Sequence, residues 1–101
     1  MIIFNTTFSV DNASIEEFID FVKQIYVVKA IETGELTRPR LVKILTENAE
    51  SSSIALQFEV KEPEHLDNWY DSTGDSLNEI LVNQFGDKVL GFSTIMEEVE
   101  L

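Results

Sequence analysis

The spacing of apolar side chains predicts four strands. In residues 1–10, an apolar residue or a threonine occupies every second position, which is the repeat of a strand with one buried face. Residues 54–61 repeat this alternation most clearly, and a polar turn is expected before them over residues 48–53. The expected strands cover residues 1–10, a segment from Leu36 or Pro39 to Thr46, residues 54–61 and residues 88–99.

Apolar residues at spacings of three and four predict a first helix between the first two strands. Ser14 followed by Glu17 has the pattern of a capping box at its start. The β-branched pair Val27 and Val28 marks a point where the helix is expected to bend or restart. Gly34 is expected to follow its end, where a left-handed conformation is common.

A second helix is predicted between the third and fourth strands. Pro63 suits its first turn, where a missing amide proton costs nothing, and Gly86 is expected to end it. Gly74 lies inside this helix, which costs about 1 kcal/mol relative to alanine unless close packing requires a glycine.

The element order β-α-β-β-α-β predicts an α+β fold of the ferredoxin-like kind. In this topology both helices cover one face of a four-stranded antiparallel sheet, and the first and third strands lie at its centre. The 101 residues suffice for a single domain, which we expect over residues 1–101.

One face of the sheet is expected to carry the core, and the other to remain open. Phe4, Phe8, Leu56 and Phe58 are assigned to the core face, so they do not form the base-stacking surface of an RNA-recognition module. The residues expected on the open face are Ile3, Asn5, Thr7, Ser9, Ala55, Gln57, Glu59, Val89, Gly91, Ser93 and Ile95. Because this set is nearly uncharged, we expect two copies to pack through it as a dimeric α/β barrel, in preference to a sheet that faces solvent.

The amino-acid composition indicates which classes of partner and which cellular compartment to expect. The chain has no cysteine, which excludes disulfides and thiolate metal sites and favours the cytoplasm. Nineteen acidic residues against seven basic ones give a net charge of −12 at pH 7, so nucleic acids and membranes are not expected partners. The first strand is far too short to span a bilayer.

Four polar residues are the candidate ligand-binding side chains: Asn5, Gln57, His65 and Tyr70. Asn5 and Gln57 belong to the expected open face, whereas His65 and Tyr70 belong to the second helix. His65 has no recognisable nucleophile as a partner, so no catalytic residue is assigned. Tyr70 and its neighbour Trp69 also fit the spacing of core residues.

Two groups of charged residues have both a functional and a structural interpretation. Arg38, Arg40 and Lys43 suit an anion site, but protection of an edge strand and ion pairing explain them more simply. An acidic stripe winds along the second helix and consists of Asp67, Asp71, Asp75 and Glu79. One helix cannot surround a cation with these oxygens, so we expect a solvated helix face, no metal and no cofactor.

The chain as a whole resembles a bacterial family known as domain of unknown function 4286. The segments that carry the resemblance are residues 1–5, residues 15–23, Glu32-Thr33-Gly34, residues 40–45, Trp69-Tyr70, and residues 85–88 with the acidic tail. The resemblance implies a ferredoxin-like domain related to dimeric α/β barrels, without an assigned activity. Family members often have histidines in both helical regions, where this chain has Tyr26 and the stretch around Gly74, so no histidine role is carried over.

These observations support two hypotheses about function. The first is a homodimeric binding or assembly module without catalysis. The alternative is a cofactor-independent dimeric α/β barrel enzyme, similar to a monooxygenase or isomerase, that holds a small organic molecule between sheet and helices. An enclosed cavity lined by converging polar groups would favour the alternative.

Overall fold

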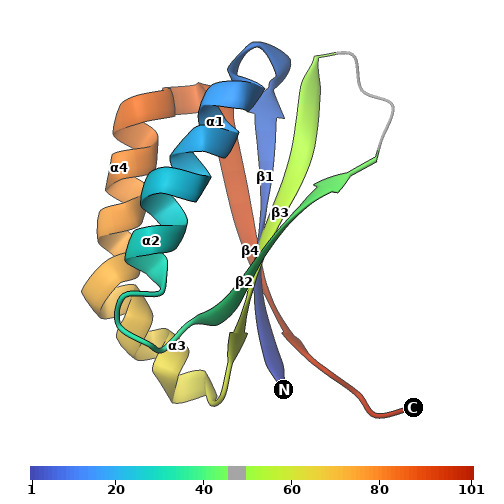
Figure 1. The fold of residues 1–101 in the computed structure, drawn as a ribbon, viewed down its shortest axis with the longest axis vertical. Helices are drawn as coiled ribbons and strands as arrows, with labels where there is room; N and C mark the ends of the chain where they lie inside the picture. Colours follow the sequence, from blue (N-terminus) through green and yellow to red (C-terminus); the bar gives the residue numbers. More distant parts are fainter. Residues whose placement is uncertain (46–49) are drawn as a thin grey trace.

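Four antiparallel strands form one sheet, and the helices cover one of its faces (Figure 1). The computed structural model describes residues 1–45 and 50–101. The strands are β1 (Ile2–Asp11), β2 (Thr37–Ile44), β3 (Ser51–Val60) and β4 (Val89–Glu97). Their order in the sheet is β2-β3-β1-β4, so the predicted central position of the first and third strands is confirmed.

The third strand begins earlier than the sequence pattern predicts. Ser51 pairs with Asp11 and Ser53 pairs with Ser9, so the expected polar turn is wrong over residues 51–53. Backbone hydrogen bonds between strands form whatever the polarity of the side chains, which explains the extension. Residues 48 and 49 of the expected turn, and the expected strand end at Thr46, lie outside the described residues.

Each predicted helix contains a five-residue π-helical turn between two α-helical parts. The first helical segment comprises α1 (Ile15–Phe21), the π turn η2 (Val22–Tyr26) and α2 (Val27–Ala30), after a short 3₁₀ turn η1 (Asn12–Ser14). The second comprises α3 (Pro63–Trp69), the π turn η3 (Tyr70–Gly74) and α4 (Asp75–Phe85), followed by a 3₁₀ turn η4 (Gly86–Lys88).

Several predicted helix boundaries agree with the structure. The expected irregularity near Val27 is present, because the first π turn ends immediately before this residue. Pro63 is in the first turn of the second helix, and Gly86 ends it with a positive φ of 58°. Ser14 precedes α1, but its side chain makes no capping hydrogen bond, so the predicted capping box is wrong in this respect.

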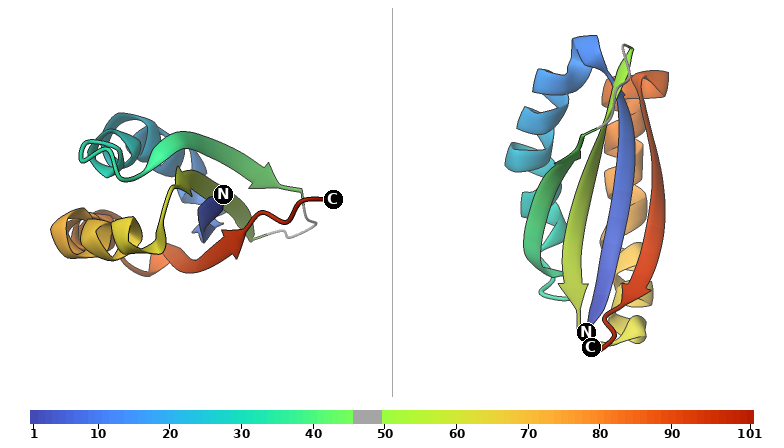
Figure 2. Two further views of the ribbon diagram at one scale, coloured as in Figure 1. Left: turned by 90° about the horizontal axis from the view of Figure 1, so that it is seen from below. Right: turned by 90° about the vertical axis from the view of Figure 1, so that its right-hand side faces the viewer.

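The core lies between the sheet and the two helical segments, and Figure 2 shows both segments on the same side of the sheet. Phe4, Phe8, Leu56 and Phe58 are all buried on the helix side, which confirms the predicted core face. The right-hand view of Figure 2 looks onto the opposite face, with the helices behind the sheet. This second face is the open face.

The predicted orientation of the fourth strand is wrong. Asn5 pairs with Thr94 and Thr7 pairs with Phe92, and paired residues share a face. The open face therefore receives Leu90, Phe92, Thr94 and Met96. The predicted set Val89, Gly91, Ser93 and Ile95 lies on the helix side. Both alternating sets of β4 contain large apolar residues, so only the pairing with β1 determines which set points outward.

Trp69 connects the two helical segments beneath the sheet. Its indole N–H donates a buried hydrogen bond of 2.8 Å to the backbone oxygen of Ala30, at the end of α2. A Cβ atom on Gly74 would lie 2.8 Å from Cζ3 of Trp69 and 3.0 Å from Cδ1 of Tyr70. The indole is fixed by its hydrogen bond and its burial, so the close packing explains the glycine inside the helix.

The variant Gly74→Ala tests this explanation, because the two effects of alanine have opposite signs. Alanine favours a helix by about 1 kcal/mol over glycine, whereas overpacking a core costs about 1–3 kcal/mol. We expect a net loss of about 1–2 kcal/mol in the free energy of unfolding, measured by urea denaturation. Ser76→Ala, at an exposed position of α4, serves as the control and is expected to change it by less than about 0.5 kcal/mol. A more stable Gly74→Ala protein would contradict the packing argument.

Candidate functional site

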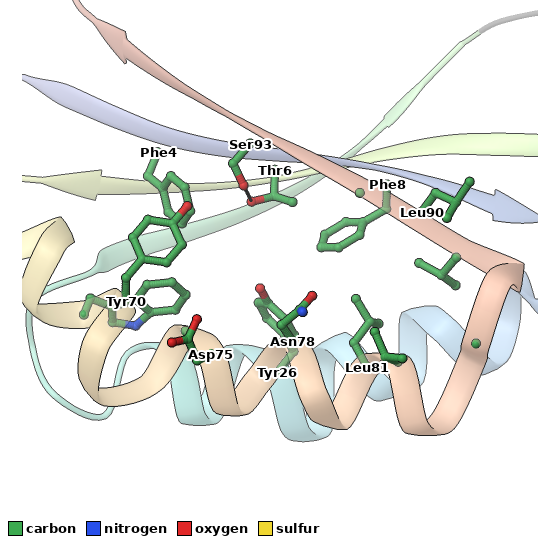
Figure 3. A pocket seen from close by; sticks show the side chains of 16 residues that line it. Phe4, Thr6, Phe8, Tyr26, Tyr70, Asp75, Asn78, Leu81, Leu90 and Ser93 are labelled. Carbon is green, nitrogen blue, oxygen red and sulfur yellow. Dashed lines mark hydrogen bonds between the residues drawn. The ribbon is translucent and has the colours of Figure 1, made fainter.

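A pocket of about 460 Å³ lies between the sheet and the helices, beneath β1 and the edge strand β4 (Figure 3). We refer to it as the interlayer pocket. It is lined by Phe4, Thr6, Phe8, Tyr26, Trp69, Tyr70, Gly74, Asp75, Asn78, Leu81, Val82, Gly86, Val89, Leu90, Gly91 and Ser93. Its volume lies within the range of about 300–1,000 Å³ that is typical of small-molecule sites.

Small residues on the helix side of the sheet explain why this space is not filled. Thr6 pairs with Ser93 and Phe8 pairs with Gly91, so β4 contributes only a hydroxymethyl group and a hydrogen atom at these two positions. A Cβ atom on Gly91 would lie 2.9 Å from the ring of Phe8, so the ring lies close against this part of β4. No large side chain of β4 fills the space above α4 at these positions.

The two π turns supply three of the lining residues. Tyr26 is the last residue of η2, and Tyr70 and Gly74 are the first and last residues of η3. A π turn changes the direction in which the following residues point, and such turns occur frequently at functional sites. Both interruptions of the helices therefore lie at the pocket.

Aromatic rings form much of the pocket wall, and neighbouring rings stand at steep angles to one another. Phe4 contacts Trp69 and Tyr70, with ring centroids 5.6 Å apart in each case and interplanar angles of 64° and 71°. The rings of Phe8 and Tyr26 are 6.1 Å apart at 82°. These edge-to-face arrangements are the favourable ones for aromatic pairs. The apolar wall is thus fixed by packing within the core.

Polar groups enter the pocket from both layers. The hydroxyl groups of Thr6 and Ser93 share a hydrogen bond of 3.0 Å on the sheet side. Asp75 and Asn78 extend from α4, and Figure 3 shows both side chains directed toward the space beneath the sheet. The hydroxyl group of Tyr26 points in the same direction between them.

Tyr26 is the most unusual polar group of the pocket. Its side chain is only 9% exposed, and its hydroxyl group makes no hydrogen bond to any residue in the described part of the chain. Burial, together with the nearby Tyr70, raises the pKa of Tyr26 from 10.0 to about 12. The group therefore stays a neutral phenol at physiological pH, able both to donate and to accept a hydrogen bond.

The four predicted ligand-binding residues do not come together. Tyr70 lines the interlayer pocket. Asn5 and Gln57 lie on the open face, where Gln57 Nε2 donates to Asn5 Oδ1 at 3.2 Å and Asn5 Nδ2 donates to Thr7 Oγ1 at 3.1 Å. His65 is partly buried in the first turn of α3, and it does not line the interlayer pocket. A ligand-binding role for all four residues stays a prediction.

Sequence reasoning did not identify Tyr26, Asp75 or Asn78 as site residues. Tyr26 has the apolar spacing of a core-facing helix, and Asp75 belongs to the acidic stripe that was assigned to solvent. No local pattern distinguishes them from their neighbours. The small residues Gly91 and Ser93 are a signal of space beneath the fourth strand, but the sequence pattern placed them on the open face.

The basic group Arg38, Arg40 and Lys43 lies on the edge strand β2, as the structural interpretation predicts. Arg38 Nε lies 3.0 Å from a carboxylate oxygen of Glu59, which is an ion pair on the surface. Arg38 also has a φ of 52°, which is rare for a residue with a side chain and coincides with a shift of register between β2 and β3. Arg38, Arg40 and Gln57 contribute to a smaller hollow of about 210 Å³.

Residues 1–45 and 50–101 show neither a group of metal ligands nor a helix suited to spanning a membrane. No group of three or more histidine, cysteine or acidic residues is arranged to hold a metal ion there. None of the helices in these ranges has both the length and the apolar character that crossing a bilayer requires.

The titration of Tyr26 tests its burial in the pocket wall. Absorbance of tyrosinate is expected to show a step at about pH 12, above the usual value of 10.0, and Tyr26→Phe should remove it. The folded protein holds this proton more tightly than the unfolded chain does. Its contribution to the free energy of unfolding is therefore fully present below pH 10 and is lost as the pH rises to about 12. It amounts to about 2–3 kcal/mol. Loss of a step near pH 10 in Tyr26→Phe would show that Tyr26 is solvated.

Solved structures of other proteins share this fold, and a family model matches the sequence. Among solved structures, the fold is similar to HapK from Hahella chejuensis, with a TM-score of 0.71 at 14% identity over 98% of this chain and 93% of that one. It is also similar to a dimeric ferredoxin-like protein from an uncultured marine organism, with a TM-score of 0.71 at 16% identity over 99% and 96% of the two chains.

A third similar structure is described as a putative antibiotic biosynthesis monooxygenase from Deinococcus radiodurans. It has a TM-score of 0.72 at 12% identity and covers 100% of this chain and 95% of that one. At such low identity these structures establish the ferredoxin-like fold alone. The sequence matches no curated protein. The family model described as domain of unknown function (DUF4286) matches residues 1–99, which confirms the predicted resemblance, and this chain belongs to that family.

Proposed function

We propose that this protein binds a small organic molecule in the interlayer pocket. The observation that carries the proposal is the pocket of about 460 Å³ with the hydroxyl group of Tyr26 directed into it, where this group has no hydrogen-bond partner among the described residues. No buried side-chain nitrogen or oxygen atom of the described residues lacks a hydrogen-bond partner, so the unpaired oxygen of Tyr26 is one that a ligand can reach. A hydrogen bond between a ligand and Tyr26 would contribute about 0.5–1.5 kcal/mol, and the aromatic wall would shelter the apolar body of the ligand.

Binding is a better proposal than catalysis in this pocket. The raised pKa of Tyr26 keeps its hydroxyl group protonated, so it does not act as a base near neutral pH. Asp75 is the acidic residue among those that line the pocket, and the histidine of the chain lies elsewhere. The enzyme hypothesis retains one supporting observation, the convergence of Tyr26, Asp75 and Asn78 on one space. It predicts that a bound molecule is recovered chemically changed.

The proposed setting is the cytoplasm of a bacterial cell. A chain of 101 residues without cysteine does not depend on an oxidising compartment for its stability. The net charge of −12 disfavours nucleic acids and anionic membrane surfaces as partners.

A pair of tryptophan variants on α4 tests whether the pocket binds ligands. Asn78 lines the pocket, so Asn78→Trp is expected to occupy much of it with an indole ring. Asn83 lies on the same helix, is exposed and does not line the pocket, so Asn83→Trp is the matched control. With added indole as the probe, NMR shift changes are expected to cluster on α4 and β4 in the control. Asn78→Trp should weaken the binding at least about tenfold, or about 1.4 kcal/mol.

Two results of this experiment would contradict the proposal. One is equal indole binding by the two variants. The other is a set of shift changes confined to the open face, since indole would then report an apolar surface and not the pocket.

The proposal also includes a homodimer that forms through the open face. Large apolar side chains are exposed there, with Phe92 65% exposed and Val42 and Ile44 close to 40% exposed. Phe92 and Val42 lie on opposite edge strands, in one row across the open face with Thr7 and Ala55 between them. Large exposed apolar side chains on one face are typical of an interface. The similar structure from the marine organism is described as dimeric, which supports a dimer for this chain.

Phe92→Glu tests the dimer by placing a charge in the proposed interface. The expected result is a monomer at tens of micromolar protein, measured by light scattering, because two buried unpaired carboxylates would oppose association. Val28→Glu is the control, since Val28 is also exposed and apolar but lies on α2, away from the open face. A wild-type monomer, or equal effects of both variants, would contradict the proposed interface.

A further inference from the structure

The charged side chain that lines the interlayer pocket is negative. Asp75 contributes a carboxylate, whereas none of the seven lysine and arginine residues of the chain lines the pocket. All seven lie within residues 1–45 and 50–101, so the comparison covers every basic residue. An anionic ligand would therefore enter without a counter-charge and against a net charge of −12.

The Asp75 carboxylate is free to interact with a ligand. Asp75 is exposed at the start of α4, and it forms no ion pair with any residue that the structure describes. Figure 3 shows its carboxylate directed upward toward the space beneath the sheet, on the same side as the hydroxyl group of Tyr26. The two groups present one negative charge and one neutral hydrogen-bonding group to the same pocket.

The aromatic wall has the same electrostatic preference. The faces of Phe, Tyr and Trp rings are negative, and they attract a cation placed within about 6 Å of the ring centroid. Phe4, Phe8, Tyr26, Trp69 and Tyr70 all line the pocket. Because neighbouring rings are inclined by 64–82°, they border the pocket in more than one plane. Aromatic rings combined with one carboxylate are suited to an organic cation.

We propose that the interlayer pocket takes a small organic cation, a protonated amine or a quaternary ammonium compound with an apolar body. Its cationic group lies between Asp75 and the aromatic wall, and the Tyr26 hydroxyl group hydrogen-bonds to the ligand. This inference rests on the proposed binding function and specifies the chemical class of the ligand. The Tyr26 hydroxyl group, which has no hydrogen-bond partner among the described residues, supplies the hydrogen bond, whereas Asp75 and the aromatic rings account for the preferred charge.

Three probes of similar shape and different charge test the inference. Phenethylamine is a cation at neutral pH, phenethyl alcohol is neutral and phenylacetate is an anion. Calorimetric titration of the wild-type protein is expected to show phenethylamine binding about tenfold more tightly than phenethyl alcohol, and phenylacetate binding most weakly. Equal affinities for the amine and the alcohol would overturn the proposed cation while leaving ligand binding itself intact.

Two variants that remove the same charge locate the effect. Asp75→Asn is expected to weaken phenethylamine binding about 3–10-fold and to leave phenethyl alcohol binding within about twofold. Asp71→Asn is the control, since Asp71 is exposed on the adjoining π turn and does not line the pocket. If both variants weaken amine binding equally, the net charge is responsible and the proposed site is wrong.

The outcomes also separate this inference from the proposal on which it depends. If none of the three probes binds, the proposal that the pocket takes an organic cation is wrong. The indole measurement with Asn78→Trp and Asn83→Trp then decides separately whether the pocket binds ligands of another class.

Discussion

The position of Trp69 is the constraint on which the arrangement of the helices depends. Its indole N–H bonds to the end of the first helical segment, and its ring packs against Phe4 of the central strand. One buried side chain thereby joins both helical segments and the sheet. A buried indole needs a hydrogen-bond acceptor at the right place, so the 2.8 Å bond to Ala30 fixes how the two segments lie against each other. Glycine is favoured at position 74 beside it, because a Cβ atom there would lie only 2.8 Å from the indole ring.

This constraint also shapes the interlayer pocket. The helices are held at a separation set by Trp69 and the phenylalanine side chains, whereas the helix side of β4 offers only Gly91 and Ser93 next to β1. Protein interiors are normally close-packed, and here large rings support the two layers while small residues leave the space between them unfilled. The π turn η2 then directs Tyr26 into that space. The chemistry of the pocket is thus a consequence of how the core packs.

The sequence predicted the fold well and the candidate site poorly. The order of elements and the core faces of β1 and β3 follow from periodicities within each segment, so they were correct. The orientation of β4 was wrong, since its two alternating sets are both partly apolar and its register depends on β1. Of the four predicted ligand-binding residues, only Tyr70 lines the interlayer pocket. Asn5 and Gln57 lie on the open face as predicted, but the sequence does not show that the space for a ligand lies between the sheet and the helices.

The sequence by itself determined the β-α-β-β-α-β order, the central strands, the family and the negative charge of the molecule. These properties depend on composition and on residues close together in the chain. Only the tertiary structure decided which residues of β4 face outward, where the helices leave a pocket, and that the Tyr26 hydroxyl group has no hydrogen-bond partner among the described residues. Each of these depends on β1, β4 and both helical segments meeting in space, and the packing of segments so distant in sequence has no local signature.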